Sequence, residues 1–212
     1  MSHAELDSPE PTPGGDTPAA GARKRPKPGE RRVQILQALA TMLEQPGAER
    51  ITTAALAARL EVSEAALYRH FASKAQMFEG LIEFIEQSVF TLINQIAERE
   101  LPGQPQAVRI VTMLVQFAEK NPGMTRVMVG DALVFENERL QQRMNQFFDK
   151  VETSLKQCLR ATGDASDTPT VDAQVRASVL TAFIVGRLQR FARSGFKRAP
   201  SEHLEASLAQ ML

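Results

Sequence analysis

Residues 52–70 read TTAALAARLEVSEAALYRH, and this stretch decides the fold. Thr52 and Ser63 stand where N-caps are expected, since hydroxyl side chains accept hydrogen bonds from the free N–H groups of a first helical turn. Each cap follows an apolar residue and precedes another one four positions later, the spacing of a hydrophobic staple. The stretch therefore predicts two short helices, over residues 52–60 and 63–70.

Two helices this short, joined by about two residues, predict the crossed arrangement of a helix-turn-helix. The second helix is narrow enough to enter the major groove of DNA. Ser63 and Ala65 are small, so the backbone can approach base edges, and alanine can contact a thymine methyl group. Donor side chains suited to phosphate oxygens follow along and beyond this helix: Tyr68, Arg69, His70 and Lys74.

The distribution of charge agrees with a DNA-binding role, although the total charge does not. The chain has 25 basic and 25 acidic residues, which argues against a general polyanion binder. Residues 23–76, however, carry ten basic and five acidic groups, whereas residues 1–22 carry four acidic groups and no basic one. A basic segment is the footprint of a nucleic-acid face, but a solvated run of charges would look the same.

From residue 30 onward the apolar residues recur with helical spacing, and no alternating strand pattern occurs. The sequence predicts an all-α protein with a helix-turn-helix DNA-binding domain over 30–76 and a helical domain over 77–212. Ser73 and Gln76 form a capping box for a helix of roughly 40 Å, long enough to join the two domains. Further helices are predicted over 108–118, 124–135 with a break at Gly130, 138–160, 171–193 and 201–212.

The helices at 138–160 and 171–193 are long, amphipathic and nearly adjacent. They predict a homodimer in which each subunit contributes two helices to a four-helix bundle. Two-fold symmetry would place the recognition helices about 34–36 Å apart and predicts a palindromic DNA site. The interface residues predicted on these helices are Phe147, Val151, Val179 and Phe183.

Residues 1–29 are rich in glycine and proline and offer little to bury, so a disordered tail is predicted. Its basic end, residues 23–27, either reaches a DNA backbone or belongs to an uninvolved solubilising tail. The single cysteine, Cys158, excludes an intramolecular disulfide and lies on an apolar stripe. Neither a membrane span nor a signal peptide is recognisable, so a cytoplasmic protein is expected.

The stretch from Val62 to Lys74, with Thr52-Thr53 and Leu56-Ala57 before it, resembles the DNA-binding domain of TetR-type regulators. The resemblance covers residues 30–76 and implies that Thr52 and Thr53 belong to the DNA face with the residues named above. Glu61 departs from the pattern, because relatives often have glycine there. A non-glycine residue with positive φ at this turn would cost about 1–2 kcal/mol.

Over about residues 30–200 the chain is similar to TetR-type members that act in nucleoid occlusion, notably in EKNPGMTR at 119–126. This similarity implies a nucleoid-associated homodimer that antagonises polymerisation of the tubulin-like division protein FtsZ. It places the FtsZ-facing surface on the outer sides of the fourth and fifth helices, at Phe84, Lys120 and Asn121. Leu92 departs from the basic residue of that pattern.

Two other functions remain open on the sequence. A TetR-type repressor would bind a small ligand in its C-terminal domain, and an apolar ligand is compatible with the composition. An enzyme is not expected, because His3, His70 and His203 are scattered and no catalytic or metal-binding motif is present. No metal and no cofactor are predicted.

Overall fold

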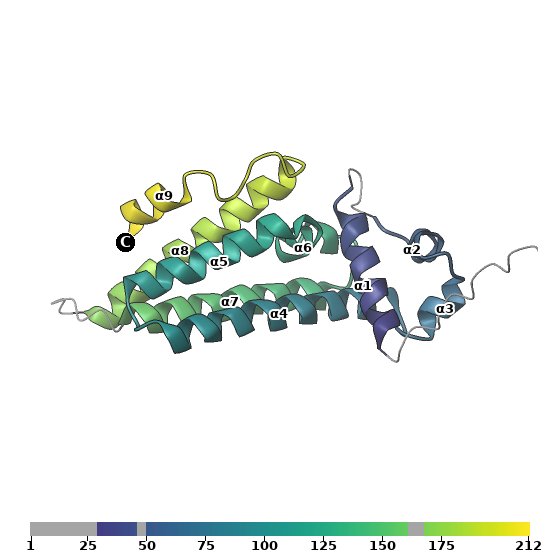
Figure 1. Cartoon of the computed structure of the whole chain (residues 1–212), viewed down its shortest axis with the longest axis horizontal. Helices are drawn as coiled ribbons and strands as arrows, with labels where there is room; N and C mark the ends of the chain where they lie inside the picture. The colour runs from purple at the N-terminus through teal and green to yellow at the C-terminus, as the bar shows by residue number, and fades with distance from the viewer. Residues whose placement is uncertain (1–28, 46–49, 161–167) are drawn as a thin grey trace, which may run out of the picture.

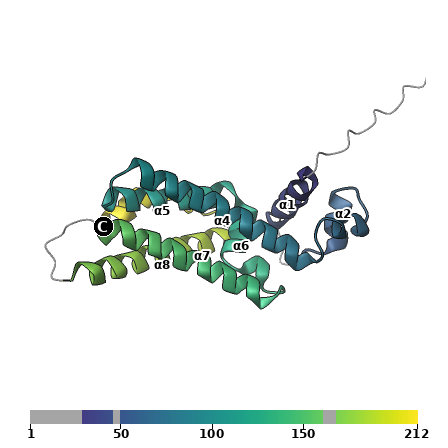
Figure 2. The same ribbon diagram turned by 90° about the horizontal axis from the view of Figure 1, so that it is seen from below.

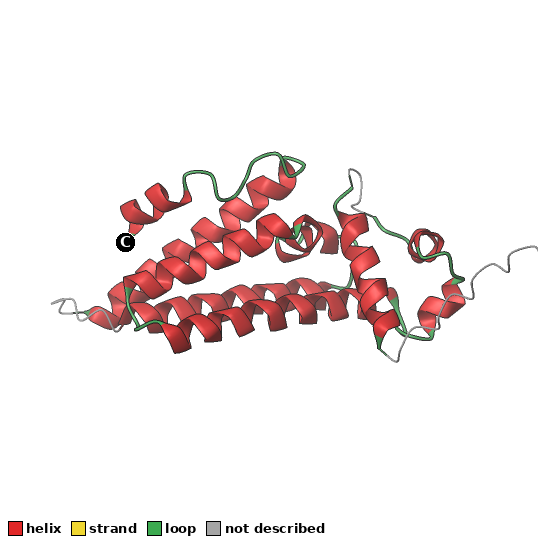
Figure 3. Ribbon diagram, viewed as in Figure 1, coloured by secondary structure: helices red, strands yellow, loops and turns green. Residues whose placement is uncertain are grey.

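The computed structural model describes residues 29–45, 50–160 and 168–212, and over these residues the protein is helical without strands. The long helices run side by side along one axis, and three shorter helices form a unit beyond one end of them (Figure 1). The view in Figure 3 shows that helix accounts for most of the described chain. The predicted tail lies outside the described residues, apart from Gly29.

The unit at the end of the molecule contains α1 (Glu30–Leu43), α2 (Thr53–Arg59) and α3 (Glu64–Tyr68). The predicted caps are confirmed: Thr52 Oγ1 accepts from the backbone N–H of Ala55 at 3.1 Å, and Ser63 Oγ accepts from that of Ala66 at 3.2 Å. Helix α3 is shorter than predicted, because the chain turns after Tyr68.

The remaining helices form the body of the molecule. They are α4 (Lys74–Arg99), α5 (Gln104–Lys120), α6 (Pro122–Met128), the 3-10 helix η1 (Asp131–Leu133), α7 (Glu138–Arg160), α8 (Pro169–Arg193) and α9 (Leu204–Met211). The 26 residues of α4 give a length of about 39 Å, close to the predicted one. Gly130 adopts φ 83° between α6 and η1, which confirms the predicted break.

The capping box at the start of α4 is present in a variant form. Ser73 Oγ accepts from the backbone N–H of Gln76 at 3.2 Å. The Gln76 side chain reaches back one residue further than expected and accepts from the N–H of Ala72 at 2.8 Å. Two N–H groups at the entry to α4 are thereby satisfied by side chains.

In the body, α4 and α5 lie against α7 and α8, as the turned view shows (Figure 2). The core between them contains Phe147 and Val151, both fully buried, and the Phe147 ring meets the edge of Phe90 at a centroid distance of 5.5 Å. These two residues therefore pack inside the protomer, and the prediction that they lie on a dimer interface does not hold. Apolar spacing on a helix indicates burial but does not say which neighbour provides it.

Close packing joins the terminal unit to the body, and an ion pair braces two helices of the body itself. A Cβ built on Gly123 of α6 would lie 1.9 Å from the carbonyl oxygen of Ala40 in α1, so only glycine permits this approach. The Arg143 guanidinium on α7 donates to both carboxylate oxygens of Glu86 on α4, at 3.2 and 2.6 Å. The hydrogen bond to Glu86 raises the pKa of Arg143 above its ordinary value.

Within the described ranges, none of the helices combines the length and the apolar character that crossing a membrane would require.

Candidate nucleic-acid interface

Helix α3 lies at the far end of the terminal unit with one side buried and the other open to solvent (Figure 1). Leu67 is 1 % exposed and fixes the inner side of the helix. Ser63, Ala65 and Arg69 are exposed, and the Tyr68 ring is 45 % exposed. Four of the predicted DNA-contacting residues are thus open to solvent. The small ones lie at the start of α3 and the hydrogen-bond donors at its end, a distribution that a major groove accepts.

Hydrogen bonds connect this surface to the start of α2. The Thr53 hydroxyl donates to Glu64 Oε2 at 2.6 Å, and the Tyr68 hydroxyl lies 3.5 Å from Thr53 Oγ1. Thr52 is exposed beside them and caps α2. These hydrogen bonds bring Thr53 beside Glu64 and Tyr68, and the assignment of the two threonines to a DNA face stays a prediction.

Arg32 is a supporting residue that the sequence analysis did not identify. Its guanidinium donates to the backbone carbonyl of His70 and stacks over the Phe71 ring at 4.1 Å. Both contacts hold the chain where it leaves α3, with His70 partly buried. The sequence offered one signal for Arg32, its position in the basic segment. Its contact with His70 could not be predicted, because the two residues are 38 positions apart.

The Lys74 side chain, predicted to contact phosphate, forms an ion pair within the protein. Its ammonium group lies 2.5 Å from Glu136 Oε1, and the Glu136 side chain is only 10 % exposed. Glu136 belongs to the body, between η1 and α7. Lys74 is the first residue of α4, where the chain enters the body, and its ion pair holds the start of α4 to the segment before α7.

The turn between α2 and α3 requires the backbone geometry anticipated for Glu61. Its φ is 54°, in the left-handed region that favours glycine. The turn keeps its shape despite the side chain, because the N–H of Val62 donates to the carbonyl of Ala57 at 3.0 Å. The chain accepts a strain of about 1–2 kcal/mol here.

The three residues predicted to face FtsZ differ in their surroundings. The Phe84 side chain on α4 is 47 % exposed, and Lys120 at the end of α5 is also exposed. Asn121 is partly buried, and its side-chain amide donates to the carbonyl of Phe117 at 2.7 Å. Phe84 and Lys120 are thus available to a partner, whereas Asn121 helps to end α5.

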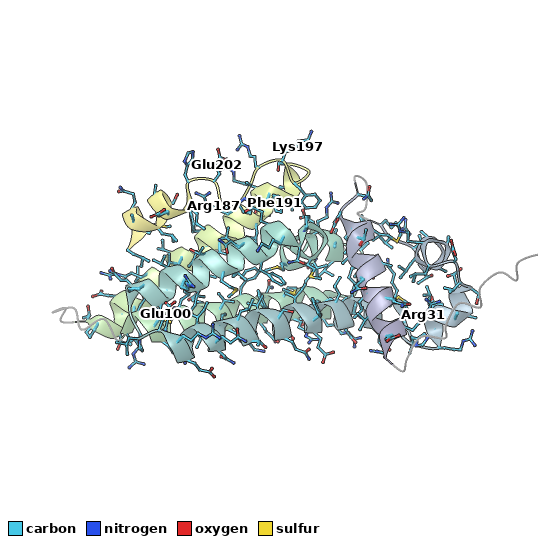
Figure 4. The ribbon with its side chains drawn as sticks, in the orientation of Figure 1. Arg31, Glu100, Arg187, Phe191, Lys197 and Glu202 are labelled. Atoms are coloured by element: carbon cyan, nitrogen blue, oxygen red, sulfur yellow. The ribbon has the colours of Figure 1, made fainter. Side chains whose placement is uncertain are left out.

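An open cleft of about 360 Å³ lies between α4 and α5, beyond Phe84 along α4. Its lining includes the half-exposed Leu92 together with Met113, Arg99, Arg109 and Glu100. Glu100 is labelled in Figure 4, near the end of α4. Arg109 lies 3.4 Å from the Glu100 carboxylate, so part of the charge in the cleft is paired.

Cys158 is 5 % exposed, as its apolar stripe predicted. Burial raises the pKa of its thiol to about 11, so the reactive thiolate is disfavoured at neutral pH. No group of three or more His, Cys, Asp or Glu side chains suited to a metal ion occurs in the part of the chain that the structure describes.

The helical fold and the capped pair of short helices define a TetR-type DNA-binding regulator. The family model described as "Bacterial regulatory proteins, tetR family" matches residues 35–81. A second model, SlmA-like and described as "Tetracyclin repressor-like, C-terminal domain", matches residues 106–212.

The chain belongs to the SlmA family of TetR-type regulators. It is 51 % identical over 177 residues to the nucleoid occlusion factor SlmA of Idiomarina loihiensis, covering 83 % of this chain and 90 % of that protein. It is 50 % identical over 189 residues to SlmA of Vibrio vulnificus, covering 88 % and 94 %. This is a family of DNA-binding regulators, which is not a class of enzymes.

Solved structures with low sequence identity share the fold. The fatty acid degradation regulator FadR of Bacillus halodurans has a TM-score of 0.71 at 12 % identity, with 87 % of this chain and 95 % of that chain covered. FadR of Bacillus subtilis, solved with stearoyl-CoA, has a TM-score of 0.65 at 13 % identity, with 84 % and 96 % covered. At such identities the likeness concerns the architecture alone.

Proposed function

We propose that the protein is a nucleoid-occlusion factor: a homodimer that binds palindromic chromosomal sites and, when bound, inhibits FtsZ polymerisation over the nucleoid. It would act in the cytoplasm, at the nucleoid. The observation that carries the proposal is the identity of about 50 % to SlmA proteins, which extends through the DNA-binding unit and the body alike. TetR-type proteins of different function would be expected to diverge in the body.

The exposed side of α3 supports the DNA-binding step. Ser63 and Ala65 would face base edges, and Tyr68 and Arg69 would contact phosphates. Replacing Arg69 by alanine should weaken binding to all duplexes and lower the salt-dependence slope by about 1. Arg109→Ala removes the same positive charge from the body and should leave duplex binding unaltered.

An exposed apolar row on α8 supports the homodimer. Val171, Val175 and Val179 recur every four residues and are 59 %, 57 % and 48 % exposed. Further along the helix, no described atom lies within 4 Å of where a Cβ on Gly186 would stand. A second subunit could therefore approach α8 closely and bury this row, with Val179 and the partly buried Phe183 inside the interface. Of the four predicted interface residues, these two remain candidates.

The outer sides of α4 and α5 support the FtsZ-binding step. Phe84 and Gln95 are eleven residues apart, so they lie within about 20° of each other around α4. This places an exposed aromatic side chain in line with the cleft that Leu92, Gln95 and Arg99 border. A peptide with an apolar anchor and acidic groups would suit such a surface.

Sedimentation of FtsZ filaments with the protein, in the presence and absence of its palindromic duplex, tests the proposal. We expect the pelleted fraction to fall when the DNA-bound protein is present. Phe84→Ala should restore pelleting, whereas Phe135→Ala, which removes another exposed phenylalanine, should not. Intact filaments in both conditions would overturn the proposal and favour a ligand-responsive repressor.

A further inference from the structure

A concentration of positive charge lies far along the chain from the DNA-binding unit. Residues 187–201 contain five basic residues and no acidic one, although the whole chain has no net charge. The segment runs from the last turns of α8 into the loop before α9. Figure 4 shows Arg187 on α8 below the loop that carries Lys197 and Glu202.

This segment borders an open cleft of about 640 Å³, called here the α8–α9 cleft. Its charged and titratable lining residues are Arg187, Arg190, Lys197, Arg198, Glu202 and His203. The rest of the lining is an alanine and a proline, so the cleft offers neither an apolar floor nor a phenylalanine or tyrosine ring. Its volume falls within the range of small-molecule sites, but its chemistry is that of an anion site.

The Arg187 side chain is bound to protein groups that form the wall of the cleft. Its guanidinium donates to the carbonyl of Pro200 at 3.2 Å, to that of Glu202, and to Ser207 Oγ at 2.9 Å. It also stacks over the Phe183 ring at 4.6 Å. These contacts tie the loop and the start of α9 to α8, which sets the width of the cleft.

The opposite wall is held by a compact turn. Ser194 Oγ accepts from the backbone N–H groups of Lys197 and Arg198, at 3.1 and 2.9 Å. Phe196 has φ 64°, unusual for a bulky residue, and its ring contacts the edge of Phe191 at 5.1 Å. The turn therefore fixes where the side chains of residues 197 and 198 begin.

Three cations in the cleft are not neutralised by their surroundings. The charged groups of Arg190, Lys197 and Arg198 form no ion pair or hydrogen bond with any side chain among the described residues. The acidic residue of the lining, Glu202, has its carboxylate 3.8 Å from His203. Like charges held close together repel, and an anion that carries several charges would relieve this repulsion.

We propose that the α8–α9 cleft binds small ligands that carry two or more linked phosphate groups. Arg190 and Arg198 can each form paired hydrogen bonds to phosphate oxygens, and Lys197 adds a compact point charge. The aromatic ring of the lining is the His203 imidazole, whose side chain is 83 % exposed, so the cleft encloses no aromatic platform and reads the phosphates and not a base. Nucleoside triphosphates and inorganic tripolyphosphate should therefore bind with similar affinity.

The position of the cleft favours a small ligand over a DNA backbone. The loop lies on the side of the body, with α1 and α6 between it and α3 (Figure 1). A duplex seated on α3 would run past the end of the molecule. A concave site closed by α9 also suits a compact anion better than a continuous strand of phosphates.

Isothermal titration of the full chain with sodium tripolyphosphate, ATP and inorganic phosphate tests the proposal. We expect tripolyphosphate and ATP to bind within threefold of each other and at least about tenfold more tightly than phosphate. Lys197→Ala and Arg198→Ala should each weaken tripolyphosphate binding about fivefold to tenfold. Tighter binding of ATP alone would show that a base is read and would contradict the proposed phosphate recognition.

Arg193→Ala is the matched control, because Arg193 is exposed on the same segment but does not line the cleft. It should change the affinity less than twofold, and binding of the palindromic duplex should be unaltered in all three variants. Equal losses in the three variants would indicate diffuse attraction and overturn the proposal. Absence of tripolyphosphate binding would also overturn the proposal. So would a different result: a duplex without the palindrome displaces tripolyphosphate from the wild type, and only Lys197→Ala and Arg198→Ala lose binding to that duplex.

Discussion

The DNA-binding unit and the body are both helical, but they are held together by different kinds of contact. In the unit, α2 has seven residues and α3 has five, and each begins at a side-chain cap three residues from the N–H it satisfies. In the body, α4, α5, α7 and α8 have 17 to 26 residues each, and their buried rows contact residues far along the chain. Local contacts therefore shape the surface proposed to meet DNA, whereas long-range packing shapes the surfaces proposed for partners.

The junction between the two regions should be the most sensitive place. Gly123→Ala would put a Cβ against the Ala40 carbonyl, so α6 and α1 must separate. We expect a loss of about 3 kcal/mol in the free energy of unfolding by urea, with weaker duplex binding because α1 carries the unit.

Gly80→Ala is the control for that change. A Cβ there would lie 3.3 Å from the ends of the Leu36 and Phe71 side chains, which can adjust. Its effect should stay within about 1 kcal/mol, since alanine also favours the helix. Equal effects of the two variants would show that the α1–α6 approach is not the tight contact described.

The body should carry a pH-dependent contribution to stability from its buried cysteine. Burial raises the pKa of Cys158 from 9.0 to about 11, so folding favours the neutral thiol. Its contribution is complete below pH 9 and is lost as the pH rises through 11, a loss of about 2 kcal/mol by pH 11.

Urea unfolding of the wild type and of Cys158→Ala across this range measures that contribution, because other groups titrate equally in both. The difference in stability between the two proteins should shrink as the pH rises. A constant difference from pH 8 to 11 would mean that Cys158 does not titrate as its burial implies.

Loss of a local cap should have a smaller effect, confined to the unit. Ser63→Ala removes the acceptor for the Ala66 N–H and should cost about 1 kcal/mol while weakening duplex binding. Ser154→Ala, within α7, removes a hydroxyl that donates to the Lys150 carbonyl and caps nothing. Its effect should lie within about 0.5 kcal/mol. A larger loss of stability for Ser154→Ala than for Ser63→Ala would contradict the stabilising role given to the cap.

The smallest effect is expected for the ion pair at the start of α4, where the chain enters the body from the unit. A double-mutant cycle on Lys74 and Glu136 should give a coupling of about 0.5 kcal/mol in unfolding free energy. The more exposed pair of Arg109 and Glu100, within the body, should give less. A larger coupling for the Arg109–Glu100 pair would show that the lower exposure of the Lys74–Glu136 pair does not strengthen it.

The class of fold, the two caps of the DNA-binding unit and the position of most helices could be predicted from the sequence alone. Helices over 138–160 and the break at Gly130 follow from spacing and from backbone preferences, which act between near neighbours. The positive φ of Glu61 was suggested only by the resemblance to TetR-type regulators, which often have glycine at this turn.

Which neighbour each apolar or charged side chain contacts could be seen only in the three-dimensional structure. It placed Phe147 and Val151 inside the protomer, left the valine row of α8 exposed, and paired Lys74 with Glu136. It also gathered cations from α8 and the following loop around one cleft. Helical spacing records that a side chain is buried or exposed, but the partner of each side chain depends on how distant helices pack, and that information is not local.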